Sequence, residues 1–98
     1  MKTESIIKPP QSQKMNAGGV TLGPGESMPE HTTGDNEELI VVLMGRIFVD
    51  VVQPSGETVS EGLTQGQFLY IPPNTKHGVR NQFRKEKRAG YLYVVTPI

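Results

Sequence analysis

Short apolar segments separated by turn residues make up most of this sequence. They and some of the segments between them are predicted to form β-strands at 15–22, 38–44, 47–52, 58–60, 68–71, 76–81 and 91–95. The segment 26–33 is polar and contains Pro29, which predicts an edge or irregular strand. Glycine and proline stand between the predicted strands, as in Gly23-Pro24-Gly25 and Pro54-Ser55-Gly56. No window of eleven or more residues carries a helical pattern of apolar positions without a glycine or proline inside it. The pattern therefore indicates an all-β sandwich or barrel.

The strand predicted at 38–44 suggests how its neighbours are arranged. It is apolar on both faces, so both faces should be covered. Because Gly45 follows directly, we expect 38–44 and 47–52 to form a hairpin closed near Gly45. A turn at Gly34-Asp35 should likewise make 26–33 and 38–44 adjacent antiparallel strands.

The sequence also predicts an N-terminal segment outside the barrel and an apolar strand face without a cover. Residues 1–13 are polar apart from Ile6-Ile7, so we expect an arm or edge strand there and one barrel domain over 14–98. The face with Leu39, Val41 and Leu43 points away from the barrel lining. Such an apolar face needs a second sheet or a subunit against it, and we predict a homodimer.

Composition excludes several classes of function. The 98 residues carry ten Lys+Arg against ten Asp+Glu, which is not the footprint of a nucleic-acid-binding protein. The basic segment 84–88 is more plausible as a solvated loop than as a phosphate or nucleic-acid patch. No apolar run approaches membrane-spanning length and no secretory signal is visible, so we expect no membrane partner and a cytoplasmic location. The absence of cysteine excludes disulfides, thiolate metal sites and cysteine nucleophiles.

Two histidines and one acidic residue are the candidates for chemistry. His31 and Glu38 lie seven residues apart on either side of the Gly34 turn, which would let their side chains meet. His77, just past Pro72-Pro73-Asn74, could join them only through tertiary closure such as a barrel wall. Glu37 is the competing acid, but Glu38 shares the strand face of Ile40, Val42 and Met44, and Glu37 points the other way. A carboxylate buried on that apolar wall needs a partner, and a metal ion would be one.

The spacing of these residues resembles the two motifs of the cupin family. The first motif matches at Gly25, His31, Glu38 and Gly45. Five residues separate the first glycine from the histidine, six separate the histidine from the glutamate, and six separate the glutamate from the second glycine. The second matches at Gly66, Pro72, His77 and Asn81. Two of the ten fixed positions differ: Thr33 replaces a metal-binding histidine, and Asn74 replaces a glycine. Asparagine is the non-glycine residue most tolerant of positive φ, so we take the change at Asn74 as conservative.

This resemblance implies a small jelly-roll barrel, also called a double-stranded β-helix, that holds one divalent metal ion. His31, Glu38 and His77 would be its ligands, a set that suits Fe, Mn, Zn, Ni or Co. Thr33 and Ile40 are expected beside the site. Thr33 either fills space or places its hydroxyl against a metal-bound water.

The resemblance also implies a small oxygen-rich metabolite as ligand. Lewis-acid metal chemistry on that metabolite would make the protein a dioxygenase, an isomerase or a decarboxylase. The alternative is a non-catalytic small-molecule-binding or sensor module, with or without metal. A third reading is a purely structural barrel that never binds metal. Metal analysis of the purified protein separates these readings most cheaply, because protein without metal at any supplied ion would support the structural one.

Overall fold

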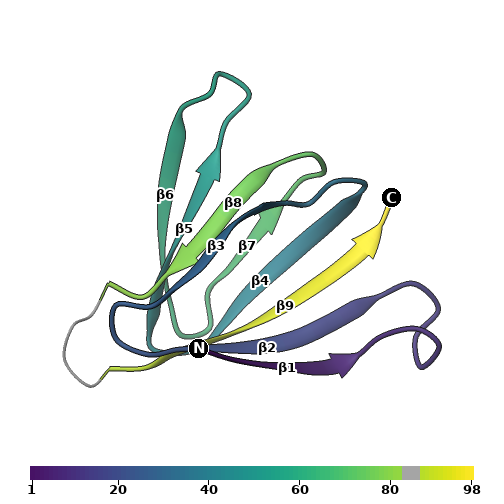
Figure 1. The fold of residues 1–98 in the computed structure, drawn as a ribbon, viewed down its shortest axis with the longest axis horizontal. Helices are drawn as coiled ribbons and strands as arrows, with labels where there is room; N and C mark the ends of the chain where they lie inside the picture. Colours follow the sequence, from purple (N-terminus) through teal and green to yellow (C-terminus); the bar gives the residue numbers. More distant parts are fainter. Residues whose placement is uncertain (83–86) are drawn as a thin grey trace.

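Nine β-strands form two antiparallel sheets in the computed structural model, which describes residues 1–82 and 87–98 (Figure 1). The strands are β1 (Lys2–Ile7), β2 (Asn16–Leu22), β3 (Ser27–Thr32), β4 (Asn36–Met44), β5 (Arg46–Val52), β6 (Thr58–Thr64), β7 (Phe68–Ile71), β8 (Lys76–Arg80) and β9 (Ala89–Pro97). Within the described ranges no helix has the length and apolarity needed to span a bilayer. Of the basic loop predicted at 84–88, residues 84–86 lie outside the described part of the chain.

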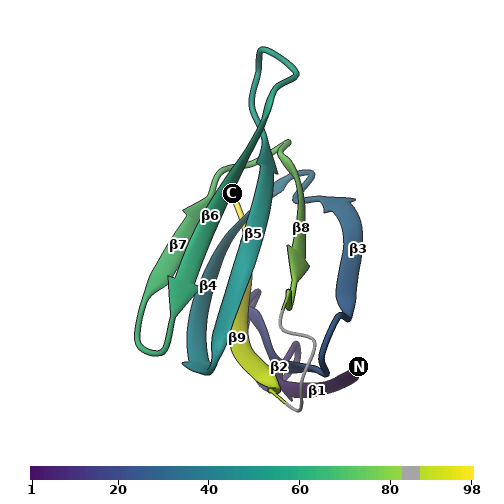
Figure 2. The same cartoon turned by 90° about the vertical axis from the view of Figure 1, so that its left-hand side faces the viewer.

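The two sheets face each other as a jelly roll, which confirms the predicted fold class (Figures 1 and 2). The five-stranded sheet has the order β1-β2-β9-β4-β7, and the four-stranded sheet has the order β3-β8-β5-β6. Strands far apart in the sequence are therefore neighbours, such as β3 with β8 and β2 with β9. All pairings between them are antiparallel.

The hydrophobic core lies between the sheets and follows from the alternation of residues along the strands. On β4, Ile40 and Val42 are fully buried with Glu38, as the predicted strand phase requires. A register shift after Val42 breaks this alternation, so Met44 is 45% exposed instead of facing inward as predicted. The remaining core is built from Val20, Leu22, Ile47, Val49, Leu63, Ile71, Val79, Ala89 and Tyr91.

The predicted hairpin of 38–44 with 47–52 is wrong. The strand β4 pairs with β7 and β9, and β5 pairs with β6 and β8, so the chain changes sheet at Gly45. Gly45 is the single residue between the two strands and has φ +74°. A Cβ there would lie 2.6 Å from the carbonyl oxygen of Arg88, so only glycine fits this corner.

The predicted pairing of 26–33 with 38–44 is also wrong. The strand β3 pairs with β8 in the four-stranded sheet, and β4 lies in the other sheet. The turn between β3 and β4 contains Gly34 at φ +57° and is closed by a hydrogen bond from the Asn36 N–H to the Thr33 carbonyl (3.1 Å). This turn carries the chain from one sheet to the other. Residues on β3 and β4 therefore meet across the interior and not along a shared ladder.

The N-terminal segment and the apolar face predicted to be uncovered both belong to the five-stranded sheet. Residues 2–7 form β1, the edge strand of the five-stranded sheet, paired with β2. On the outer face of that sheet Leu39 lies opposite Tyr70 and Val41 opposite Phe68. Phe68 is 68% exposed and Leu43 is 55% exposed. The homodimer that would cover this face stays a prediction.

Candidate metal centre

His31, Glu38 and His77 come together in the interior of the jelly roll. One possible ligand atom from each lies within 4.8 Å of those from the other two. His31 on β3 and His77 on β8 are direct partners in the sheet register, and Glu38 reaches them from β4 in the opposite sheet. His77 thus joins His31 through strand pairing, whereas Glu38 joins by closure of the two sheets. This is the reverse of the route that the sequence suggested.

Backbone carbonyls fix which nitrogen each histidine presents to the interior. The Nδ1 of His31 lies 2.9 Å from the Pro29 carbonyl oxygen, and the Nδ1 of His77 lies 3.2 Å from the Thr75 carbonyl oxygen. A carbonyl oxygen only accepts hydrogen bonds, so Nδ1 carries the proton in both rings. In the neutral form of each ring, Nε2 is then left with a free lone pair. This is the arrangement that orients an imidazole to ligate a metal ion.

The Nε2 of His77 has no hydrogen-bond partner in the described part of the chain, although the residue is fully buried. It lies 3.5 Å from Oε1 of Glu38, a contact that is attractive only when His77 is protonated and that lacks hydrogen-bond geometry. Burial by itself lowers the pKa of His77, but the Glu38 carboxylate and the Thr75 carbonyl outweigh it, and the pKa is raised above its ordinary value. The buried Nε2 of His77 therefore faces the Glu38 carboxylate without a hydrogen bond to it.

This donor set fits a divalent cation. Two imidazole nitrogens and one carboxylate oxygen suit the ions of the middle and late first transition series. A cation between them would use the lone pair of the buried His77 Nε2, which has no hydrogen-bond partner in the described part of the chain. His31 is exposed, so the site is reached from solvent on the β3 side. The three residues could therefore hold a cation that still has room for a small ligand.

The Thr33 hydroxyl bonds to the neighbouring loop. It donates to the Pro72 carbonyl oxygen (2.7 Å) and accepts from the Thr75 N–H (3.0 Å). Its single hydrogen is thereby used, and Thr33 ties the β3–β4 turn to the turn before β8. Ile40, also expected beside the site, is fully buried in the hydrophobic core and is not among the side chains that line the cavity described next.

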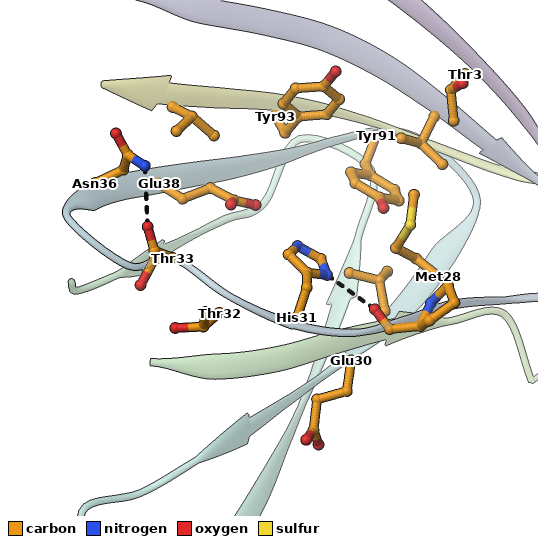
Figure 3. Close-up of a pocket in the computed structure, with 14 residues that line it drawn as sticks. Thr3, Met28, Glu30, His31, Thr32, Thr33, Asn36, Glu38, Tyr91 and Tyr93 are labelled. Carbon is orange, nitrogen blue, oxygen red and sulfur yellow. Dashed lines mark hydrogen bonds between the residues drawn. The ribbon is translucent and has the colours of Figure 1, made fainter. Parts of the chain in front are cut away.

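A cavity of about 610 Å³ opens next to the three residues (Figure 3). His31 and Glu38 line it together with Asn36, Tyr91 and Tyr93. The tyrosines were not singled out in the sequence. Tyr91, Tyr93 and Val95 alternate along β9 and so share its inner face, a signal that the sequence of 91–95 carried. The other lining residues are Thr3, Val20, Met28, Pro29, Glu30, Thr32, Thr33 and Val79.

Tyr91 presents a hydroxyl group to this cavity. The residue is only 3% exposed and its hydroxyl makes no hydrogen bond within the described ranges. Burial, with a smaller effect of the negative charge of Glu38, raises the pKa of Tyr91 well above its ordinary value. The hydroxyl is therefore neutral at physiological pH and available as a hydrogen-bond donor.

Glu37, Asn74 and Asn81 lie outside the group of candidate ligands, and each has another contact or role in the fold. Glu37 interacts with Tyr70 on the outer side of the sheet, and so lies on the opposite face of β4 from Glu38. Asn74 adopts φ +53°, which confirms that a residue tolerant of the left-handed region is needed there. Asn81 is buried, and its side-chain N–H groups donate to the carbonyls of Leu22, Gly23 and Lys87.

Solved structures with similar folds are numerous, and three illustrate them. The Schizosaccharomyces pombe Cnp3 cupin domain superposes with a TM-score of 0.82 at 17% identity, covering 98% of this chain and 64% of that one. An oxalate oxidase in complex with the substrate analogue glycolate gives 0.85 at 15% identity, covering 98% and 50%. A deletion mutant of Bacillus subtilis oxalate decarboxylase OxdC gives 0.83 at 20% identity, covering 97% and 25%.

These similarities establish the fold, and the sequence itself establishes the family. This chain spans between 25% and 64% of the length of those three chains. A search of curated proteins found no sequence match. The family model Cupin_2, described as Cupin domain, matches residues 18–95, which include both motifs and all three candidate ligands. The chain therefore belongs to the cupin family.

Proposed function

We propose that this cupin holds one divalent cation on His31, Glu38 and His77 and uses it to bind a small oxygen-bearing metabolite. The proposal is carried by the buried Nε2 of His77, which lacks a hydrogen-bond partner within the described ranges and faces Glu38. The protonated Nδ1 of each histidine supports it, because the two Nε2 lone pairs are then directed to the same space. Fe, Mn, Zn, Ni and Co all suit these donors.

The cation would act as a Lewis acid on an oxygen atom of the metabolite. The chain's own residues would fix the donors and supply a polar contact to the ligand. The Pro29 and Thr75 carbonyls hold the imidazole rings, and the Tyr91 hydroxyl offers a neutral hydrogen-bond donor from the cavity wall. Glu38 supplies one negative charge, so a divalent ion on these ligands keeps a net positive charge that attracts an anionic oxygen.

The comparisons support a small oxygen-bearing acid as the kind of ligand. Matched folds include an oxalate oxidase bound to the substrate analogue glycolate and an oxalate decarboxylase, and both names refer to small acids rich in oxygen. The cavity volume of about 610 Å³ lies within the range of small-molecule sites. We carry over only this ligand class and not either reaction.

A matched pair of glutamates on β4 tests the proposed site. The variant Glu38→Gln removes the proposed ligand charge with little change of shape, and Glu37→Gln makes the same change on the outer face of the strand. Protein purified without chelator should contain close to one divalent ion per chain. We expect Glu38→Gln to weaken the affinity for Zn²⁺ at least a hundredfold, since even partners behind a ligand are worth about 10–100-fold.

The control decides whether the loss is local. Glu37→Gln should bind Zn²⁺ within about twofold of the original chain, because its carboxylate does not face the histidines. Elemental analysis and calorimetric titration give the two readouts. Equal affinity in Glu38→Gln and Glu37→Gln, or no retained ion in the unmodified protein with any of the five metals, would refute the proposed site.

A further inference from the structure

The cavity wall away from the histidines is mostly apolar and aromatic, with Thr3 and Asn36 as its polar members. Val20 and Val79 are each 2% exposed, and Met28 and Tyr93 pack against the same core. We propose that the ligand has two parts, an oxygen-bearing head and an apolar or aromatic body, and that Tyr91 donates a hydrogen bond to the head. This proposal rests on the proposed cation site. The head would bind at the cation, and the body would lie along β9 and β2.

The charges around the cavity argue against a second anionic group on the ligand. Glu38 and Glu30 are the charged acids in the lining, and Figure 3 shows the Glu30 side chain pointing away from the cavity. No lysine or arginine is among the described residues that line it. A carboxylate on the ligand body would therefore be buried without a cationic partner, which is costly.

The two tyrosines form the part of the wall that a flat ligand body would contact. In Figure 3 the Tyr91 hydroxyl points toward the His31 side of the cavity, whereas the Tyr93 hydroxyl points away from it. A Cβ at Gly18 would overlap the Tyr93 hydroxyl, so the glycine leaves the room that this ring occupies. Tyr91 thus offers its polar end to the head of the ligand, and Tyr93 offers its ring to the body.

Three 2-oxo acids share the same head and differ only in the body, so a comparison of their affinities isolates the contribution of the body. Pyruvate carries a methyl body, phenylpyruvate a benzyl body, and 2-oxoglutarate a body that ends in a carboxylate. Their dissociation constants are measured by calorimetry on the zinc-loaded protein, because Zn²⁺ has no redox chemistry of its own. We expect phenylpyruvate to bind at least tenfold more tightly than pyruvate, from burial of one aromatic ring. We expect 2-oxoglutarate to bind more weakly than phenylpyruvate, and by a larger factor than the tenfold difference expected for pyruvate.

Neighbouring positions on β9 supply the variants and their controls. Val95 lines the cavity, and Val94 lies on the opposite face of the strand. The variant Val95→Asn should reduce the preference for phenylpyruvate over pyruvate to below threefold, and Val94→Asn should keep it. Tyr91→Phe should weaken all three acids about fivefold through loss of one hydrogen bond, and Tyr70→Phe, an exposed tyrosine on the outer face, should weaken none.

Each outcome decides between this inference and the proposed function. Zinc retained with phenylpyruvate preferred, and that preference lost in Val95→Asn alone, supports both. Zinc retained with pyruvate or 2-oxoglutarate bound as tightly as phenylpyruvate overturns the apolar body and leaves the cation site standing. Equal affinities in Tyr91→Phe and the original chain overturn the role of Tyr91. Failure to retain zinc or any of the other four metals overturns the proposed function, and this inference falls with it.

Discussion

Gly45 and Gly25 form a natural pair for measuring what the corner between the sheets requires. Their φ angles are +74° and +75°, so alanine at either position meets the same left-handed backbone strain, about 1 kcal/mol. Their surroundings differ. A Cβ at Gly25 meets no atom within 4 Å, whereas a Cβ at Gly45 would lie 2.6 Å from the Arg88 carbonyl oxygen and 3.2 Å from the Ala89 Cα.

The clash at Gly45 involves backbone atoms that cannot rotate aside. Relieving it requires β4 and β9 to separate, and overpacking of this kind costs about 1–3 kcal/mol. We therefore expect Gly25→Ala to lower the free energy of unfolding by about 1 kcal/mol and Gly45→Ala by about 2–4 kcal/mol. For a chain of 98 residues the difference corresponds to a gap in melting temperature of roughly 4–20 °C.

Urea titrations followed by circular dichroism, with chelator present to exclude any effect of bound metal, measure both variants under the same conditions. The slope of the unfolding free energy against urea should be unchanged, since the folded state still buries the same surface. Equal destabilisation of Gly25→Ala and Gly45→Ala would refute the steric argument, because backbone strain alone would then account for both.

Three further predictions concern pH, an ion pair and assembly. The pKa of His77 is raised above its ordinary value of 6.5, so protons should begin to compete with a metal ion for Nε2 at a pH above 6.5. The affinity for Zn²⁺ should therefore fall as the pH drops from 8 to 5.5, and a flat profile would argue against histidine ligation. Arg80 holds the pKa of Asp50 below its usual range, so the pair stabilises the fold above the unfolded pKa of Asp50, and this stabilisation is lost as the pH falls through the folded pKa. Asp50→Asn should cost about 0.5–1 kcal/mol at pH 7, and denaturant titrations should show this cost shrinking as the pH is lowered through the folded pKa. Light scattering should give twice the mass of one chain, and Phe68→Glu should give the mass of one chain; an unmodified protein of single-chain mass would refute the dimer.

Strand positions and the inward face of β4 could be predicted from the sequence because they depend on local alternation. Glu38 was assigned to the inner face by its phase with Ile40 and Val42, and both of those are buried beside it. The strand β6 runs to Thr64 and not to Ser60, since Glu61-Gly62 resembles a turn in isolation. Its pairing with β5, where Gly62 lies opposite Phe48, extends the strand.

Strand partners could not be predicted in this way, because local alternation does not say which sheet a strand joins. Both expected pairings, across Gly34 and across Gly45, assumed that consecutive strands are neighbours, and in each case the chain changes sheet. The candidate ligands were nevertheless brought together, since the family spacing of His31, Glu38 and His77 carries topology that periodicity lacks. Tyr91 was missed because a tyrosine in a terminal strand is usually core or surface, and only closure of the sheets makes it part of a cavity wall.

The strand that carries His31 is the outermost of its sheet and is held on one side only, by β8. Strands in that position open locally more readily than central ones, which exposes their amides to hydrogen exchange. A cation shared by His31 and His77 would bridge this last pair of strands from the side chains, and so resist their separation. Exchange at Ser27–Thr32 should then slow as the cation concentration rises, in proportion to site occupancy, whereas the amides of β5 should not respond.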